Sequence, residues 1–197
     1  MKEEQLHELM LQSLEHEKGG VKVYEAALKC AVNEDLRQEW EEYLDQTRSH
    51  VKTLTEVCAA MGIEADKETP GRAIVRDLGT ALIAAMEMAR ADGDPSAAQL
   101  VAAECVVLAE TKDHLDWELL SKCTAHLDGK EADVLKQACE DVEDEEDEHL
   151  YHTKGWCREL WIESLGMKAV LPPPEEKQHV KTAIGAARAE QSVAGKR

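Results

Sequence analysis

The sequence lacks phenylalanine, is poor in proline, and contains no apolar run near the length that a membrane-spanning helix requires. Such a helix needs about 20 consecutive apolar residues. The alternation of apolar and polar residues that marks a half-buried strand is also missing. Alanine, glutamate, leucine and lysine, which favour helices, are abundant instead. We therefore expect an all-α protein that has no membrane partner.

Positive charge is scarce as well, because 23 lysines and arginines accompany 41 aspartates and glutamates, giving a net charge of −18. A chain this acidic repels nucleic acids and anionic membrane surfaces and attracts cations. The six cysteines form no Cys-x-x-Cys motif, which excludes zinc ribbons, rubredoxin-type iron sites and thioredoxin-like dithiols. The first ten residues, MKEEQLHELM, are charged and amphipathic, unlike a secretory signal. We expect free thiols and a cytoplasmic location.

Hydrophobic periodicity predicts four long helices and one further helix in the connection between the second and the third. The long helices are expected over residues 3–32, 35–61, 95–126 and 131–165, and the further helix over residues 72–91. Gly62 and Gly166 each follow the end of a helix, and Asp94 with Pro95 begins another. Two helix hairpins joined by a long crossover are typical of a four-helix bundle. Three short helices beside one separate long helix are the alternative.

We expect the bundle to occupy residues 1–166. Residues 167–197 contain three consecutive prolines and then a basic, alanine-rich stretch, which predicts a tail that is partly flexible or docks on a second subunit. We therefore expect a homo-oligomer.

The two predicted hairpins resemble each other. A shift of 93 residues overlays the first helix on the third and aligns Glu17 with Glu110, and a shift of 99 overlays the second on the fourth and aligns His50 with His149. Two pairs of cysteines align under the same two shifts. This pattern indicates an internal two-fold repeat of a helix hairpin. Chance similarity between helices of like composition is the alternative.

Polar side chains interrupt the apolar stripe near the middle of each long helix, where the core is expected. An unpaired buried carboxylate is costly, and the nearby lysines and arginines lie off the stripes. Hard and borderline metal ions supply positive charge and bind carboxylate oxygen and imidazole nitrogen. In Glu146-x-x-His149 the two side chains lie one turn apart on one face and can reach one ion. The predicted metal ligands are Glu17, His50, Glu110, His114, Glu146 and His149.

Two kinds of neighbour accompany these residues. Glu145 and His152 lie beside the stripe of the fourth helix, where they could support the ligands, while the other acids of the segment 143–152 are expected to face water. Tyr24 and Trp117 follow the glutamates of their helices by about two turns, and we expect both to pack in the core.

This arrangement resembles the ferritin-like superfamily, the group of ferritins, rubrerythrins and related di-iron carboxylate proteins. Its pattern is one Glu from each of two helices and Glu-x-x-His from each of the other two. Glu17 and Glu110 match the single glutamates. Glu146 and His149 match one Glu-x-x-His motif in full, and His50 matches the histidine of the other. The resemblance implies a ferritin-like four-helix bundle that binds two iron ions, or manganese in their place.

The resemblance, which covers residues 3–165, has one departure: Thr47 stands where the family pattern has the glutamate of the second helix. Three interpretations are open. In the first, His114, one turn beyond the glutamate of the third helix, replaces the missing ligand. In the second, Gln46 or Asp45 reaches inward through a local distortion of the helix. In the third, one of the two metal sites is weakened.

Three functions are consistent with these residues. The first, implied by the resemblance, is a di-metal oxidoreductase (ferroxidase-like or peroxidase-like) that oxidises Fe(II) or a small substrate with dioxygen or peroxide. The second is iron binding or sequestration without turnover, which the departure at Thr47 favours. The third is a helical interaction module whose metal site has degenerated. A metal count separates the third function from the other two, and oxidation after ferrous loading separates the first from the second.

Overall fold

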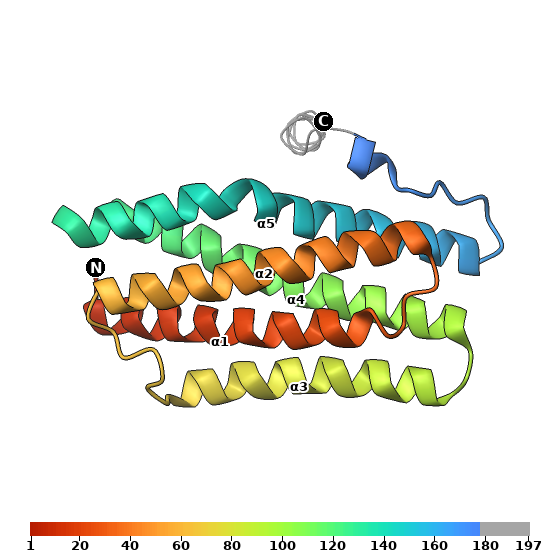
Figure 1. Ribbon diagram of the computed structural model, residues 1–197, viewed down its shortest axis with the longest axis horizontal. Helices are drawn as coiled ribbons and strands as arrows, with labels where there is room; N and C mark the ends of the chain where they lie inside the picture. Colours follow the sequence, from red (N-terminus) through yellow and green to blue (C-terminus); the bar gives the residue numbers. More distant parts are fainter. Residues whose placement is uncertain (178–197) are drawn as a thin grey trace, which may run out of the picture.

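The computed structural model describes residues 1–177 of the chain, which form five α-helices and one short 3-10 helix and contain no strand. The five long helices run side by side (Figure 1). The prediction of an all-α protein is therefore confirmed for these residues. The elements are α1 (Glu3–Ala27), α2 (Glu34–Ala60), α3 (Pro70–Ala91), α4 (Pro95–Thr124), α5 (Gly129–Ser164) and η1 (Pro174–Lys177).

Short polar residues and glycines set the ends of these helices. The Asn33 side chain accepts a hydrogen bond from a backbone N–H of α2, and the side chains of Thr69 and Asp94 do the same at the starts of α3 and α4. Gly62 and Gly166 follow α2 and α5 with φ of 69° and 74°, a conformation in which a side chain would be strained. The signals predicted at Gly62, Asp94 and Gly166 therefore coincide with observed helix ends.

The first helix is shorter than predicted, because α1 ends at Ala27 and not near residue 32. Side chains from other helices bind the backbone that comes next. Arg37 of α2 donates to two carbonyls in residues 28–31, and the Gln99 side-chain oxygen of α4 accepts from the N–H groups of residues 32 and 33. These tertiary hydrogen bonds satisfy groups that a longer helix would have paired internally, so that the chain can turn early.

The helices enclose two separate apolar clusters. α1 packs against α2, α3 and α4, and α5 packs against α2 and α4. One cluster, around Tyr24, Trp40 and Trp156, lies toward one end of the assembly, and the other, around Leu14 and Leu54, lies toward the opposite end. The middle segments of α1, α2, α4 and α5 contribute to neither cluster. The predicted polar ligands fall in these middle segments.

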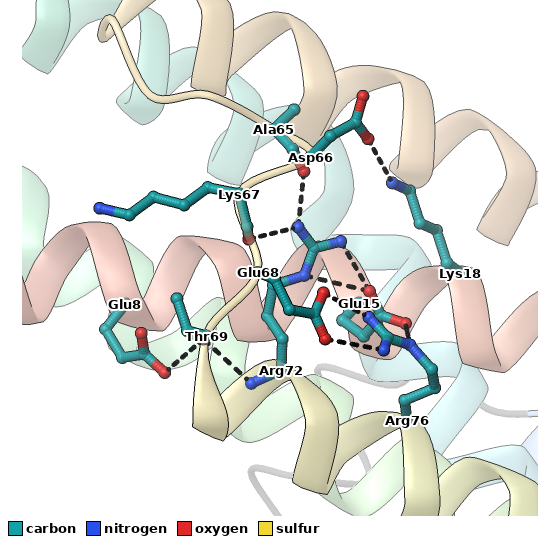
Figure 2. Close-up of polar contacts among 10 residues, drawn as sticks. All are labelled: Glu8, Glu15, Lys18, Ala65, Asp66, Lys67, Glu68, Thr69, Arg72 and Arg76. Carbon is teal, nitrogen blue, oxygen red and sulfur yellow. Dashed lines mark hydrogen bonds and ion pairs between the residues drawn. The ribbon is translucent and has the colours of Figure 1, made fainter.

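An arginine network fastens α3 to α1 (Figure 2). Buried Arg72 donates to the Glu15 carboxylate and to two backbone carbonyls of the α2–α3 connection, and Arg76 bridges Glu15 and Glu68. Burial raises the pKa of Glu15, but the hydrogen bonds from Arg76 and Arg72 outweigh burial and lower that pKa to about 2. Every charge in this network has a partner, so the network holds α3 in a fixed place. Within residues 1–177 no helix combines the length and the apolar character needed to cross a membrane.

Candidate metal centre

Six ionisable side chains meet in the layer between the two apolar clusters. They come from all four of the helices that surround this layer, and none is more than 4% exposed. Five of them were predicted from the sequence, and the sixth is an aspartate of α4 that was not. The six residues are Glu17, His50, Glu110, Asp113, Glu146 and His149.

These residues form two overlapping groups of metal-ligand type. Ligand atoms of Glu17, His50 and Glu146 lie within 4.8 Å of one another, and so do carboxylate oxygens of Glu110, Asp113 and Glu146. Glu146 belongs to both groups. A carboxylate has two oxygens, so Glu146 is placed to serve two neighbouring ions.

Both histidines turn Nδ1 toward the carboxylates. His50 Nδ1 lies 3.0 Å from a Glu146 oxygen and 3.5 Å from a Glu17 oxygen. His149 Nδ1 lies 3.5 Å from a Glu110 oxygen and 3.8 Å from a Glu146 oxygen. The two imidazoles therefore flank Glu146 and offer the same ring atom to the centre.

The opposite ring nitrogens are held by acceptors outside the centre. His50 Nε2 lies 2.7 Å from a Glu145 oxygen, and His149 Nε2 lies 2.7 Å from the side-chain oxygen of Gln46. An acceptor at Nε2 holds a proton on that nitrogen, so Nδ1 is the nitrogen that would give up its proton to bind a metal ion. Glu145 thus lies beside a predicted ligand, as expected, and its role in supporting that ligand stays a prediction. Gln46, predicted as a substitute ligand, lies on the outer side of His149 instead.

The electrostatics of the centre show a shortage of positive charge. Burial raises the pKa of Glu146 to about 7, and burial together with nearby Glu17 and Glu146 holds the pKa of Asp113 well above its ordinary value. Burial lowers the pKa of His50, but the adjacent carboxylates of Glu146 and Glu17 outweigh burial and raise that pKa to about 11. In the part of the chain that the structure describes, no lysine or arginine forms an ion pair with any of the four carboxylates. The four buried carboxylates therefore lack a lysine or arginine partner, and a bound cation would supply the missing positive charge.

Unpaired polar atoms point to the same conclusion. Of the twelve buried side-chain nitrogen and oxygen atoms without a hydrogen-bond partner in residues 1–177, six belong to this centre. Each such atom costs about 1–3 kcal/mol if nothing binds it. All six atoms are of the kinds that bind metal ions, and all six belong to residues of the two groups described above, so the donor set fits a metal. The six atoms are Glu17 Oε2, His50 Nδ1, Glu110 Oε2, Asp113 Oδ1 and both oxygens of Glu146.

The prediction that His114 points into the core is wrong. Its side chain is 27% exposed, and its Nε2 lies 2.9 Å from an Asp147 oxygen at the outer edge of α4 and α5. The preceding residue, Asp113, points inward, one turn after Glu110. One signal in the sequence could have identified it: Glu110 and Asp113 have the same three-residue spacing as the Glu146-x-x-His149 motif.

Thr47 does not reach the centre. It is buried, but its hydroxyl donates to the backbone carbonyl of Tyr43 at 2.7 Å. Its methyl group faces Gly20 of α1, where an added Cβ would lie 3.3 Å away. Asp113 supplies the fourth carboxylate in place of the glutamate that the resemblance leads one to expect at Thr47.

Two aromatic residues that were expected to pack in the core also lie against the predicted ligands, Trp117 against Glu17 and the ring of Tyr24 against that of His149. Trp117 Nε1 donates a hydrogen bond to a Glu17 oxygen at 2.8 Å. Tyr24 is fully buried, and burial together with nearby Glu110 raises its pKa well above the ordinary value, so its phenol keeps the proton. Trp117 of α4 contacts Glu17 of α1, and Tyr24 of α1 lies near Glu110 of α4, so both contacts cross between helices. The position of either residue on its own helix therefore gave no hint of them.

No family model, curated protein or solved structure matches this chain.

Proposed function

We propose that the protein binds two divalent metal ions, iron or manganese, at the centre described above, in a four-helix bundle of ferritin-like type formed by α1, α2, α4 and α5. The observation that carries the proposal is the set of six unpartnered atoms, from three glutamates, one aspartate and one imidazole, that converge in a layer without lysine or arginine partners. Carboxylate oxygen and imidazole nitrogen suit both metals.

The ligand set divides naturally between two ions. Glu17, His50 and Glu146 would hold one, and Glu110, Asp113 and His149 would hold the other with the help of Glu146. The four carboxylates offset the four positive charges of two divalent ions, which makes the filled centre electrically balanced.

The chemistry proposed for the centre is oxidation of Fe(II) or of a small substrate with dioxygen or peroxide, for which the metal pair would supply the redox capacity. The chain contributes the surroundings. Its two apolar clusters keep water from the ligands, Glu145 and Gln46 orient the imidazoles, and Trp117 fixes Glu17 through one hydrogen bond.

A second candidate function is metal binding without turnover. The burial of the ligands favours it, because none of the six side chains is more than 4% exposed and a substrate would need a way in. Both candidates require the same metal content and differ only in whether the loaded centre then turns over.

The test is anaerobic loading with ferrous or manganous ion, removal of free metal, and elemental analysis. We expect two ions per wild-type chain and a loss of both in Glu146→Gln, since Glu146 belongs to both ligand groups. Glu148→Gln, which changes an exposed acid on the same helix, is the matched control and should keep two ions. Equal metal content in all three proteins would refute the proposal. Admission of air to the ferrous protein then separates the candidates, because only the oxidising function consumes oxygen with repeated turnover.

A further inference from the structure

The centre is enclosed by four helices, so an ion from solution has to pass between two of them. None of the six side chains of the centre is more than 4% exposed. Four lines of contact surround these side chains, and they lie between α1 and α2, α1 and α4, α4 and α5, and α2 and α5. A cation crosses such a line at the lowest cost where carboxylates or other polar groups replace the water that it loses.

The two lines of contact beside α1 are closed at the level of the centre. Between α1 and α2 the Thr47 methyl group faces Gly20, where an added Cβ would lie 3.3 Å away. On the outside of this line Arg48 forms an ion pair with a glutamate of α1 and so contributes positive charge. Between α1 and α4, His16 Nε2 lies 2.9 Å from the carbonyl oxygen of Ala109, and α3 packs against both helices. Close packing, an arginine and a fifth helix therefore oppose the entry of a cation beside α1.

The contact between α4 and α5 has one polar pair near the centre. His114 Nε2 lies 2.9 Å from an Asp147 oxygen, and the two side chains are partly exposed. Within the described part of the chain, no hydrogen bond or ion pair joins either residue to a side chain of the centre. An ion that reached this pair would therefore have no further ligand in contact with it.

The contact between α2 and α5 differs, because it is made of polar side chains that touch the ligands. At the level of the centre, His50 Nε2 lies 2.7 Å from a Glu145 oxygen, and His149 Nε2 lies 2.7 Å from the Gln46 oxygen. The Glu145 side chain is 39% exposed, whereas that of His50 is 2% exposed. A single carboxylate thus connects solvent to a buried ligand. We call the contact formed by these four residues the α2–α5 seam.

Further acidic side chains surround the outer end of this seam. Asp141 and Glu148 lie one turn before and one turn after Glu145 on α5, and Glu42 lies one turn before Gln46 on α2. All three are exposed, and within residues 1–177 none of them forms an ion pair with lysine or arginine. Acidic groups around an opening raise the local concentration of cations and the rate at which they enter.

The groups behind Glu145 are ready to receive a cation. His50 Nδ1 and both oxygens of Glu146 are buried and have no hydrogen-bond partner. Glu145 and Glu146 are also consecutive on α5, so the partly exposed carboxylate is followed directly by the one that belongs to both ligand groups. Building on the metal-binding function proposed above, we propose that divalent metal ions enter the centre through the α2–α5 seam and that Glu145 is the carboxylate that receives them first.

The test measures how fast the full-length protein takes up excess ferrous ion without oxygen, with a chelator that traps free ion at timed intervals. We expect Glu145→Gln to bind two ions but to take them up roughly 10-fold more slowly, because an amide attracts a cation far less than a carboxylate does. Gln46→Glu adds a carboxylate to the same seam and keeps an acceptor for His149, so it should load faster than the wild type. Asp147→Asn, at the contact between α4 and α5, is the matched control and should load at the wild-type rate.

The double variant Glu145→Gln with Gln46→Glu separates entry from orientation of the imidazole. A carboxylate returned to the seam should restore most of the lost rate, whereas it could not replace Glu145 as the acceptor at His50. A Glu145→Gln that loads at the wild-type rate, a double variant as slow as Glu145→Gln, or an equal slowing in Asp147→Asn overturns the proposal. A wild type that binds no metal refutes the proposed function and the entry route together, while two bound ions with unchanged rates refute the route alone.

Discussion

The two helix hairpins have similar helices but contribute unequally to the centre. The α1–α2 hairpin provides Glu17 and His50, whereas the α4–α5 hairpin provides four side chains. The difference arises at two positions. Gly20 and Thr47 of the first hairpin correspond, under the shifts of 93 and 99 residues, to Asp113 and Glu146 of the second. The second hairpin thus has carboxylates at the two positions where the first has glycine and threonine.

The largest effect that separates the hairpins is expected at Asp113. Asp113→Ala removes a carboxylate that only the second hairpin has, and we predict that metal content falls from two ions per chain to one. His114→Ala is the matched control on the next residue, which lies outside the centre, and it should keep two ions. The measurement is elemental analysis after ferrous loading. The reverse outcome, loss in His114→Ala and none in Asp113→Ala, would restore the original interpretation of His114.

A double variant can move this carboxylate from the second hairpin to the first. Thr47→Glu combined with Asp113→Asn places the carboxylate on α2, where the side chain of residue 47 faces Gly20. We expect the double variant to regain part of the second ion that Asp113→Asn alone loses, because the number of carboxylates is restored. Metal content and thermal melting of the three proteins check this. A double variant that is folded but binds no more metal than Asp113→Asn contradicts the idea that the two positions are interchangeable.

A smaller effect is expected where each hairpin's histidine is supported by the other hairpin. Glu145→Gln and Gln46→Leu alter the acceptors at Nε2 of His50 and His149. Such outer partners typically change metal affinity by 10- to 100-fold. We predict weaker binding of this size with unchanged stoichiometry, measured by competition with a chelator. No change in affinity for either variant would mean that the imidazoles are oriented by packing alone.

The smallest effect concerns the arginine network at Glu15, which only the first hairpin has. Glu15 has a pKa of about 2 in the folded protein against an ordinary 4.5, so its stabilising contribution is present above pH 4.5 and is lost as the pH falls toward 2. We predict that the free energy of unfolding falls by an amount on the order of 2 kcal/mol across this range. Urea unfolding at pH 5 and pH 3 measures it. Glu15→Gln should reduce the pH dependence, and an identical dependence in that variant would argue against the assignment.

The sequence was sufficient for the all-α class and for five of the six residues at the centre, because inward glutamate and histidine interrupt otherwise apolar stripes. It was insufficient for Asp113, and the reason is physical. Val106 and Val107 are adjacent apolar residues, and the sequence does not show which of them faces the core. Val106 is fully buried and Asp113 follows it by two turns, whereas a stripe drawn through Val107 turns the inferred inward face by one residue, or about 100°. This places His114 inward in place of Asp113. The early end of α1 could not be predicted from its own sequence either. Arg37 of α2 and Gln99 of α4 hydrogen-bond the backbone that follows it.

We expect a pair of ions on either side of Glu146, and crystals of the protein loaded with manganese or iron test this most directly. An anomalous difference map should show two peaks per chain, about 3.5–4 Å apart, both within bonding distance of Glu146. One peak should also contact His50 and the other His149. A fully loaded crystal with no peak in this layer, and with the six side chains arranged as they are without metal, would contradict the two-ion centre.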